Sequence, residues 1–164
     1  MKKYLLPAAV LAAMFMNLPA LAISETQQNS IVDNCTSIKE TLAQIQKTDA
    51  RARVYLGSYY ETILTKFITP LNMRLVENNL SNADLVENQN NLAETRTTFV
   101  NDYISYQQNL EELVSIDCKT EPGPFYDKLI KVRQKRKIME QDTLKMRSLL
   151  SGHTKLVNKI REKL

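Results

Sequence analysis

Apolar residues recur at alternating intervals of four and three along most of the chain, and this spacing limits the fold more than any other feature. Its period of 3.5 residues is typical of helices that wind around one another in a left-handed coiled coil. The chain has only three glycines, and the polar/apolar alternation of strands is rare in it. We therefore expect an all-α protein.

The pattern predicts three long helices, at about 31–77, 83–116 and 124–163. The seam of the first comprises Ile31, Cys35, Ile38, Leu42, Ile45, Asp49, Ala52, Leu56, Tyr59 and Ile63. Pro70 should kink or end this helix, because proline removes a backbone donor and crowds the preceding turn. A polar hinge and a Pro-Gly-Pro segment separate the helices. Residues 31–164 should thus form one domain, an antiparallel three-helix bundle or coiled coil of long helices.

The N-terminus has the pattern of a secretory signal peptide spanning residues 1–22. Lys2 and Lys3 precede an apolar stretch, and Ala20-Leu21-Ala22 resembles a cleavage site. The alternative is an uncleaved membrane anchor, which prolines in so short a segment disfavour. We expect a flexible segment at 23–30 and a bacterial protein exported to the periplasm or cell surface.

The two cysteines, Cys35 and Cys118, are predicted to form a disulfide. In an antiparallel bundle, the start of the first helix and the end of the second lie at the same end. Export would place both thiols in an oxidising compartment. A redox-active thiol and a metal site are the alternatives. The chain lacks a Cys-x-x-Cys motif and contains only one histidine, which disfavours both.

Charge is distributed unevenly along the chain, which has a net charge of +4. Residues 78–121 carry −6 and residues 122–164 carry +8. One interpretation is that neighbouring second and third helices attract each other. The other is weak contact with anionic membrane lipid or cell-wall polymer; nucleic acid is not an expected partner of an exported protein. The candidate basic patch consists of Lys131, Arg133, Lys135, Arg136 and Lys137.

Asp49 and Arg136 are charged residues within the predicted seams. Asp49 lies fourteen residues beyond Cys35, or about 21 Å along a helix, and Arg136 and Tyr103 should lie at a similar height. We expect an interhelical polar layer of Asp49, Tyr103 and Arg136 that specifies register. Alternatively, the seam drifts and both charges point outward.

Three tyrosines, Tyr55, Tyr59 and Tyr60, cluster around Gly57. They form a candidate interaction patch, since tyrosine is enriched in binding surfaces. The alternative is a core edge with hydroxyl groups in water.

No catalytic, cofactor or metal motif stands out, and we do not expect an enzyme. The first hypothesis for function is a structural or protein–protein interaction bundle outside the cytoplasm, with an unknown protein partner or self-association. The second is a chaperone-like protein, or one that binds envelope polymers or anionic surfaces through the basic third helix.

The chain carries, in this order, Cys35, Ile38, Tyr59, Tyr60, Asp84, "FVNDYISY" at 99–106, Cys118 and "FYDKLIKVR" at 125–133. This order resembles exported three-helix proteins of unassigned function from candidate phyla radiation bacteria, the Saccharibacteria among them. The similarity covers roughly residues 31–150. This chain has Asn82-Ala83-Asp84 where that family often has Gly-x-Asp. The resemblance implies the fold, export and a disulfide, and no activity.

Protein recovered from the cell envelope should contain the disulfide. Its intact mass should be lower than that of the reduced chain by two hydrogen atoms, because each thiol loses one on oxidation. Mass spectrometry with and without reductant checks this, and two thiols that react with iodoacetamide before reduction would contradict it.

Overall fold

The computed structural model describes residues 23–80 and 83–162, and this part of the chain is all-helical, which confirms the predicted class. The proposed signal peptide, residues 1–22, lies outside the described residues. No described helix is both long enough and apolar enough to span a bilayer.

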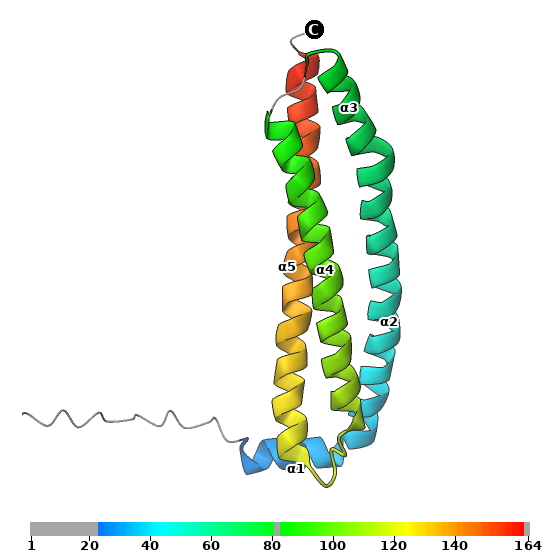
Figure 1. Cartoon of the computed structure of the whole chain (residues 1–164). Helices are drawn as coiled ribbons and strands as arrows, with labels where there is room; N and C mark the ends of the chain where they lie inside the picture. Colours follow the sequence, from blue (N-terminus) through cyan, green and yellow to red (C-terminus); the bar gives the residue numbers. More distant parts are fainter. Residues whose placement is uncertain (1–22, 81–82, 163–164) are drawn as a thin grey trace, which may run out of the picture.

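The helices form three long rods and one short crosspiece (Figure 1). One rod is a single helical path made of α2, η1 and α3. The chain then reverses into α4 and reverses again into α5, while α1 lies across one end (Figure 1). The elements are α1 (Glu25–Asp33), α2 (Cys35–Thr62), η1 (Ile63–Ile68), α3 (Thr69–Glu77), α4 (Ala83–Ser115) and α5 (Pro122–Arg161).

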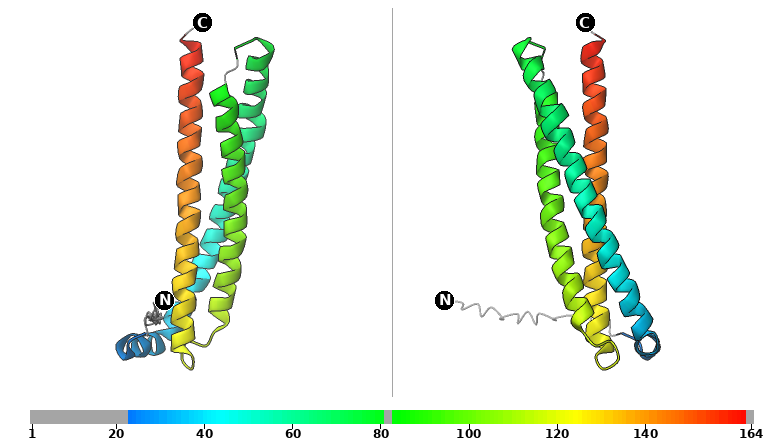
Figure 2. Two further views of the ribbon diagram at one scale, coloured as in Figure 1. Left: turned by 60° about the vertical axis from the view of Figure 1, so that its left-hand side comes forward. Right: turned by 90° about the vertical axis from the view of Figure 1, so that its right-hand side faces the viewer.

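The three rods do not contact one another equally. Helices α4 and α5 lie side by side along their length, and α2 packs mainly on α4. Figure 2 shows the α2–η1–α3 path crossing the α4–α5 pair obliquely. Its upper end, α3, packs on α4.

The heptads of α4 and α5 form the centre of the core. Buried seam residues of α4 meet those of α5, which recur every seven residues. Because a side chain such as leucine or phenylalanine contributes about 1.5–3 kcal/mol when fully buried, this seam is a main source of stability. The buried apolar residues of the pair are Leu85, Leu92, Phe99, Tyr103, Tyr106, Leu110, Leu113, Phe125, Val132, Met139 and Met146.

Residues 23–30 were expected to be flexible, and this is wrong, because α1 begins at Glu25. Ser24 and Gln27 form a capping box that satisfies backbone donors at the start of α1. The helix then breaks at Asn34, whose side-chain amide donates to the carbonyl of Ser30 over 2.8 Å. Such local hydrogen bonding by asparagine competes with the helical ladder, so the predicted first helix is not continuous from residue 31.

Pro70 does not end the α2–η1–α3 rod and stands in the first turn of α3. The six residues Ile63–Ile68 form a π-helical turn directly before α3, and the backbone N–H of Thr69 donates to the carbonyl of Leu64. Proline has no N–H to give to the carbonyl one turn back. The wider π turn lets the helical path continue past that missing hydrogen bond to Glu77.

The two chain reversals use different backbone chemistry. Asn79 has a φ of 56° just after α3, and Leu80 donates to the carbonyl of Leu75 over 2.8 Å. This is the Schellman arrangement, in which asparagine accepts the left-handed conformation. The predicted start of the third helix at 124 is late, since α5 begins at Pro122 and so includes Pro-Gly-Pro in its first turn.

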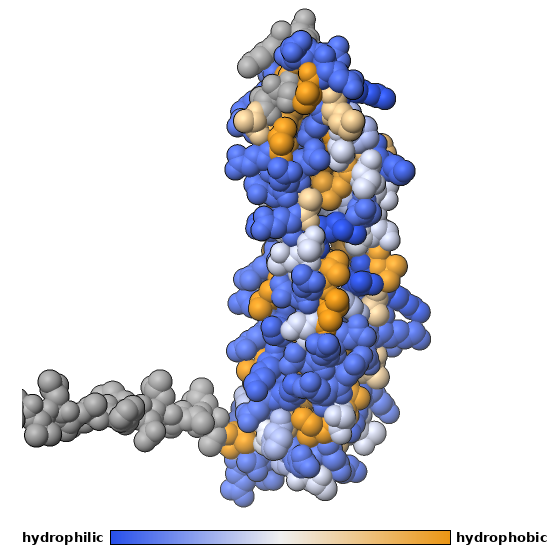
Figure 3. Space-filling model, viewed as in Figure 1, coloured by the Kyte–Doolittle hydropathy of each residue, from blue (hydrophilic) through white to orange (hydrophobic). Residues whose placement is uncertain are grey.

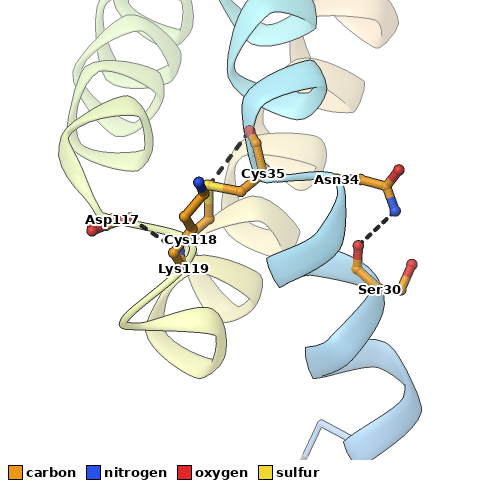
Figure 4. Close-up of a disulfide and its surroundings, with 6 residues drawn as sticks. All are labelled: Ser30, Asn34, Cys35, Asp117, Cys118 and Lys119. Atoms are coloured by element: carbon orange, nitrogen blue, oxygen red, sulfur yellow. Dashed lines mark hydrogen bonds between the residues drawn. A yellow bond between two sulfur atoms is a disulfide. The ribbon is translucent and has the colours of Figure 1, made fainter.

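Cys35 and Cys118 form a disulfide at the end of the molecule where α1 lies (Figure 4). Their Cα atoms are 5.6 Å apart, and the bond links the first residue of α2 to the connection between α4 and α5. Next to it, the N–H of Lys119 donates to the Asp117 carboxylate over 3.0 Å. The disulfide thus joins the α2–η1–α3 rod to the paired helices α4 and α5 at one end.

His153 is buried in the α5 seam, with 5% of its surface exposed. Neither ring nitrogen has a hydrogen-bond partner among the described residues. Burial disfavours the imidazolium and lowers the pKa of His153 below its ordinary value. The unfolded chain therefore takes up a proton at this site more readily than the folded chain.

The free energy of unfolding should fall as the pH drops below about 6.5, the pKa of an unperturbed histidine. The slope from this one group is at most about 1.4 kcal/mol per pH unit. Urea denaturation at pH 7.5 and 5.5 measures it. His153→Leu and His153→Gln should both remove this contribution, because neither side chain takes up a proton. Equal pH dependence in the wild type and both variants would contradict the assignment.

Candidate functional site

A buried carboxylate links all three rods, fourteen residues along α2 from Cys35. Asp49 of α2 accepts two hydrogen bonds from Arg136 of α5, from Nε over 2.8 Å and from Nη2 over 2.9 Å. It accepts a third from the Tyr106 hydroxyl of α4 over 2.7 Å. Asp49 is buried, whereas the Arg136 side chain is about half exposed. The predicted Asp49–Arg136 pair is therefore present in the structure.

The tyrosine of this polar layer is Tyr106, whereas sequence analysis named Tyr103. Both are buried positions of the α4 seam, one turn apart, so heptad spacing alone does not distinguish them. Burial raises the pKa of Tyr106, and its hydrogen bond to Asp49 raises it further. Tyr103 instead lies beneath the guanidinium of Arg53, 5.4 Å from ring centre to Cζ, a cation–π contact.

Arg136 keeps unused hydrogen-bonding capacity. A guanidinium has five N–H groups, and two of them donate to Asp49. The pKa of Arg136 is raised, mainly by its hydrogen bond to Asp49, so the group stays cationic. The carboxylate, in contrast, already accepts three hydrogen bonds, which suits it to holding Arg136 in place.

A groove of about 510 Å³ lies beside this layer, between α2 and α5. Leu56 of α2, Phe99 of α4 and Met139 of α5 supply apolar surface to it. Its cationic lining residues are Arg53, Arg133, Arg136 and Lys137, and its acidic ones are Asp49 and Glu140. The groove therefore combines apolar surface with an excess of positive charge.

A second groove, of about 340 Å³, lies between α2 and α5 on the side nearer the disulfide. It is lined largely by apolar side chains, among them Leu42, Leu129 and Val132. Arg133 and Arg136 line both grooves. The bridge from Arg136 to Asp49 thus stands between two stretches of one longer depression.

Charge pairing between α4 and α5 accounts for little of the basic run. Three ion pairs occur within residues 23–80 and 83–162, namely Arg96–Glu61, Lys128–Glu112 and Arg136–Asp49. Only Lys128–Glu112 joins α4 to α5. Of the candidate basic patch, Arg136 is paired with α2, Lys131, Arg133 and Lys137 are exposed, and Lys135 is half-buried. The expected attraction between the second and third predicted helices thus appears as one ion pair only within the described residues, and it leaves the basic patch without an α4 partner.

The tyrosine patch is only partly on the surface. Tyr55 and Tyr59 are exposed, and their rings stack with centroids 6.2 Å apart. Tyr60 is buried, with 4% of its surface exposed, so its assignment to an interaction patch is wrong, as is that of Tyr59 to the seam. A straight helix has 3.6 residues per turn and drifts away from a 3.5-residue pattern, and the π turn moves the buried face further.

Figure 3 shows the molecule in the orientation in which α4 lies in front of α5, and most of this face is hydrophilic. The apolar residues on it are separated by polar ones (Figure 3). This face does not carry a broad apolar patch.

Comparison with protein-family models, curated proteins and solved structures gave no match to this chain. The resemblance to exported three-helix proteins stays a prediction. Within the described residues, no group of three or more histidine, cysteine, aspartate or glutamate side chains is arranged to hold a metal ion.

The Tyr106 hydroxyl should stabilise the fold through Asp49. We expect Tyr106→Phe to lower the free energy of unfolding by about 2 kcal/mol, since the buried carboxylate loses a hydrogen bond. In an Asp49→Leu background the same change should cost almost nothing. Urea denaturation of the four proteins in this double-mutant cycle measures the coupling. Additive effects of the two substitutions would contradict it, and Tyr103→Phe in the same cycle is the matched control.

Proposed function

We propose that this protein is a non-enzymatic binding module that works outside the cytoplasm. It acts as an antiparallel three-helix bundle that presents the face between α2 and α5 to a protein partner. The observation that carries this proposal is the groove of about 510 Å³ with apolar surface and four cationic side chains. Grooves of this size with a few convergent polar groups are typical binding sites.

Binding suits the chemistry of this site better than catalysis does. The one buried carboxylate beside the groove accepts hydrogen bonds from Arg136 and Tyr106. Burial and Asp49 raise the pKa of Tyr106, so its hydroxyl keeps its proton at neutral pH. Three groups held in this way position one another, and the exposed part of Arg136 is free to contact a ligand.

Export is part of the proposal and rests on two observations. Residues 1–22 have the sequence pattern of a signal peptide. The Cys35–Cys118 disulfide also supports export, because disulfides persist in oxidising compartments.

A second candidate function is binding to anionic envelope surfaces. The exposed cations Lys131, Arg133 and Lys137 favour it, because none of them belongs to an ion pair of the described chain. A chaperone-like role gains no support from the face shown in Figure 3, where the apolar residues are separated by polar ones.

Photo-crosslinking in living cells tests the proposed function. A benzoylphenylalanine in place of Lys137 lies in the groove, whereas one in place of Thr97 lies on an exposed part of α4 outside it. We expect a discrete protein adduct at position 137 and none at position 97, identified by mass spectrometry.

The other outcomes separate the candidate functions. Equal adducts at both positions, or no protein adduct at either, would overturn the groove as the binding face. Lipid adducts alone at position 137 would favour the anionic-surface function, and many unrelated exported proteins would favour a chaperone.

A further inference from the structure

The face between α2 and α5 is the open side of the bundle. Helices α4 and α5 pack along their length and α2 packs on α4, but α2 and α5 make few close backbone contacts. Both grooves lie along this side, and together they extend on α2 from Ser37 to Leu56. That stretch corresponds to about 29 Å of helix, which is long enough to seat roughly five turns of another helix.

The chemistry along this side repeats at heptad spacing. Leu42 lines the groove of about 340 Å³ nearer the disulfide (the lower groove), and Leu56 lines the groove of about 510 Å³ (the upper groove). Asp49 and Arg136 form the bridge between them. Leu42, Asp49 and Leu56 are seven residues apart and therefore lie on one face of α2. Because Arg136 covers Asp49, an incoming molecule meets apolar surface, then a guanidinium, then apolar surface.

Cationic side chains on this side have groups that are not engaged by the ion pairs of the described residues. Three N–H groups of Arg136 remain after its two hydrogen bonds to Asp49. Arg133 lines both grooves and Lys137 lines the upper one, and both are exposed and outside the ion pairs of the described residues. Such cations orient an acidic partner and speed its association.

We propose that the α2–α5 face binds an acidic amphipathic helix of a partner protein, as a fourth helix laid into the groove. This inference rests on the proposed function and specifies its partner. The partner helix carries an apolar residue, an acidic residue and an apolar residue on one face at successive heptad positions. Its acidic side chain contacts Arg136, and flanking acidic side chains contact Arg133 and Lys137. Helix-in-groove recognition of this kind uses anchors on one helical face.

The geometry favours a helix over a single lipid chain. The two grooves, of about 510 and 340 Å³, are separated by the Arg136–Asp49 bridge, so one acyl chain would have to cross a guanidinium. A helix instead spans the bridge and places a carboxylate on it. Arg133, Arg136 and Lys137 lie within about one turn of α5, beside the bridge and between the two grooves, whereas a headgroup site would place its cations at one end of an apolar groove.

Fluorescence anisotropy with the chain from residue 23 to residue 164 tests the proposal. The probe is a fluorescein-labelled, 24-residue helical peptide with leucine, glutamate and leucine at successive heptad positions and further glutamates on its flanks. The matched control peptide has lysine in place of every glutamate. We expect the acidic peptide to bind and the basic one not to bind, with affinity that weakens as salt is added.

Charge-reversal variants locate the site. Arg133→Glu with Lys137→Glu should weaken binding of the acidic peptide by about tenfold or more, because two attractive contacts become repulsive. Lys155→Glu with Lys159→Glu makes the same change in net charge at exposed positions of α5 outside the grooves. It should change binding less than about threefold. Circular dichroism melting of both variants confirms that they fold.

Several results would overturn the proposal. These are no binding of the acidic peptide, equal binding of both peptides, or equal losses in the two variants. Stronger, Arg133-dependent binding to phosphatidylglycerol vesicles would assign the face to lipid, and concentration-dependent dimerisation abolished by the same variant would assign it to a second copy. A discrete protein adduct at position 137 together with one of the first three results would leave the proposed function standing and reject only the acidic helix.

Discussion

Burial of the seam between α4 and α5 is the interaction on which the rest of this structure depends. Leu92, Leu113, Phe125 and Met146 are at most 1% exposed, and α4 and α5 pack side by side along their length. At about 1.5–3 kcal/mol for each such side chain, these contacts outweigh any single polar interaction in the molecule. The α4–α5 pair forms the surface on which the α2–η1–α3 rod lies.

The α2–η1–α3 rod is held to the α4–α5 pair by a few localised interactions. The disulfide ties one end of α2 to the connection between α4 and α5. Asp49 joins α2 to Arg136 and Tyr106, fourteen residues along α2 from Cys35. At the far end, Asn72 of α3 donates to the side chain of Gln89 over 2.7 Å. Because these attachments lie mostly toward α4, the side between α2 and α5 stays open enough to contain grooves.

The same residues therefore hold the bundle together and shape its proposed binding face. Arg136 donates two of its five N–H groups to Asp49, and in the proposed complex the remaining three would face the ligand. A partner helix with a carboxylate at this height would complete the coordination of a group already held in position by Asp49. Preorganisation of this kind reduces the entropy lost on binding.

Prediction of the fold from sequence succeeded where the spacing of the residues is compatible with only one structure. The helical class and the pairing of the two cysteines follow from heptad periodicity and antiparallel connection. Prediction failed where two neighbouring residues satisfy the pattern equally well. Tyr103 and Tyr106 are both aromatic seam residues, and only the angle between helices decides which hydroxyl reaches Asp49.

Helix α2 is another place where two neighbouring residues could not be distinguished from the sequence. Tyr59 fits the 3.5-residue period, yet Tyr60 is the buried residue. The buried residues of α2 keep heptad spacing from Cys35 to Asp49, and beyond Asp49 the next buried residue is Tyr60, because a straight helix of 3.6 residues per turn drifts from a 3.5-residue pattern. The π turn before Pro70 then adds a local shift that periodicity does not contain.

The sequence by itself determined that the chain is helical, where most of its long helices run, and which two cysteines can meet. These properties follow from local periodicity, from proline and asparagine chemistry, and from the order of segments. Only the tertiary structure decided that α2 lies obliquely on an α4–α5 pair, that the basic run of α5 is mostly unpaired, and that two grooves adjoin Arg136. Those outcomes depend on crossing angles between helices, which arise from packing of all three rods together.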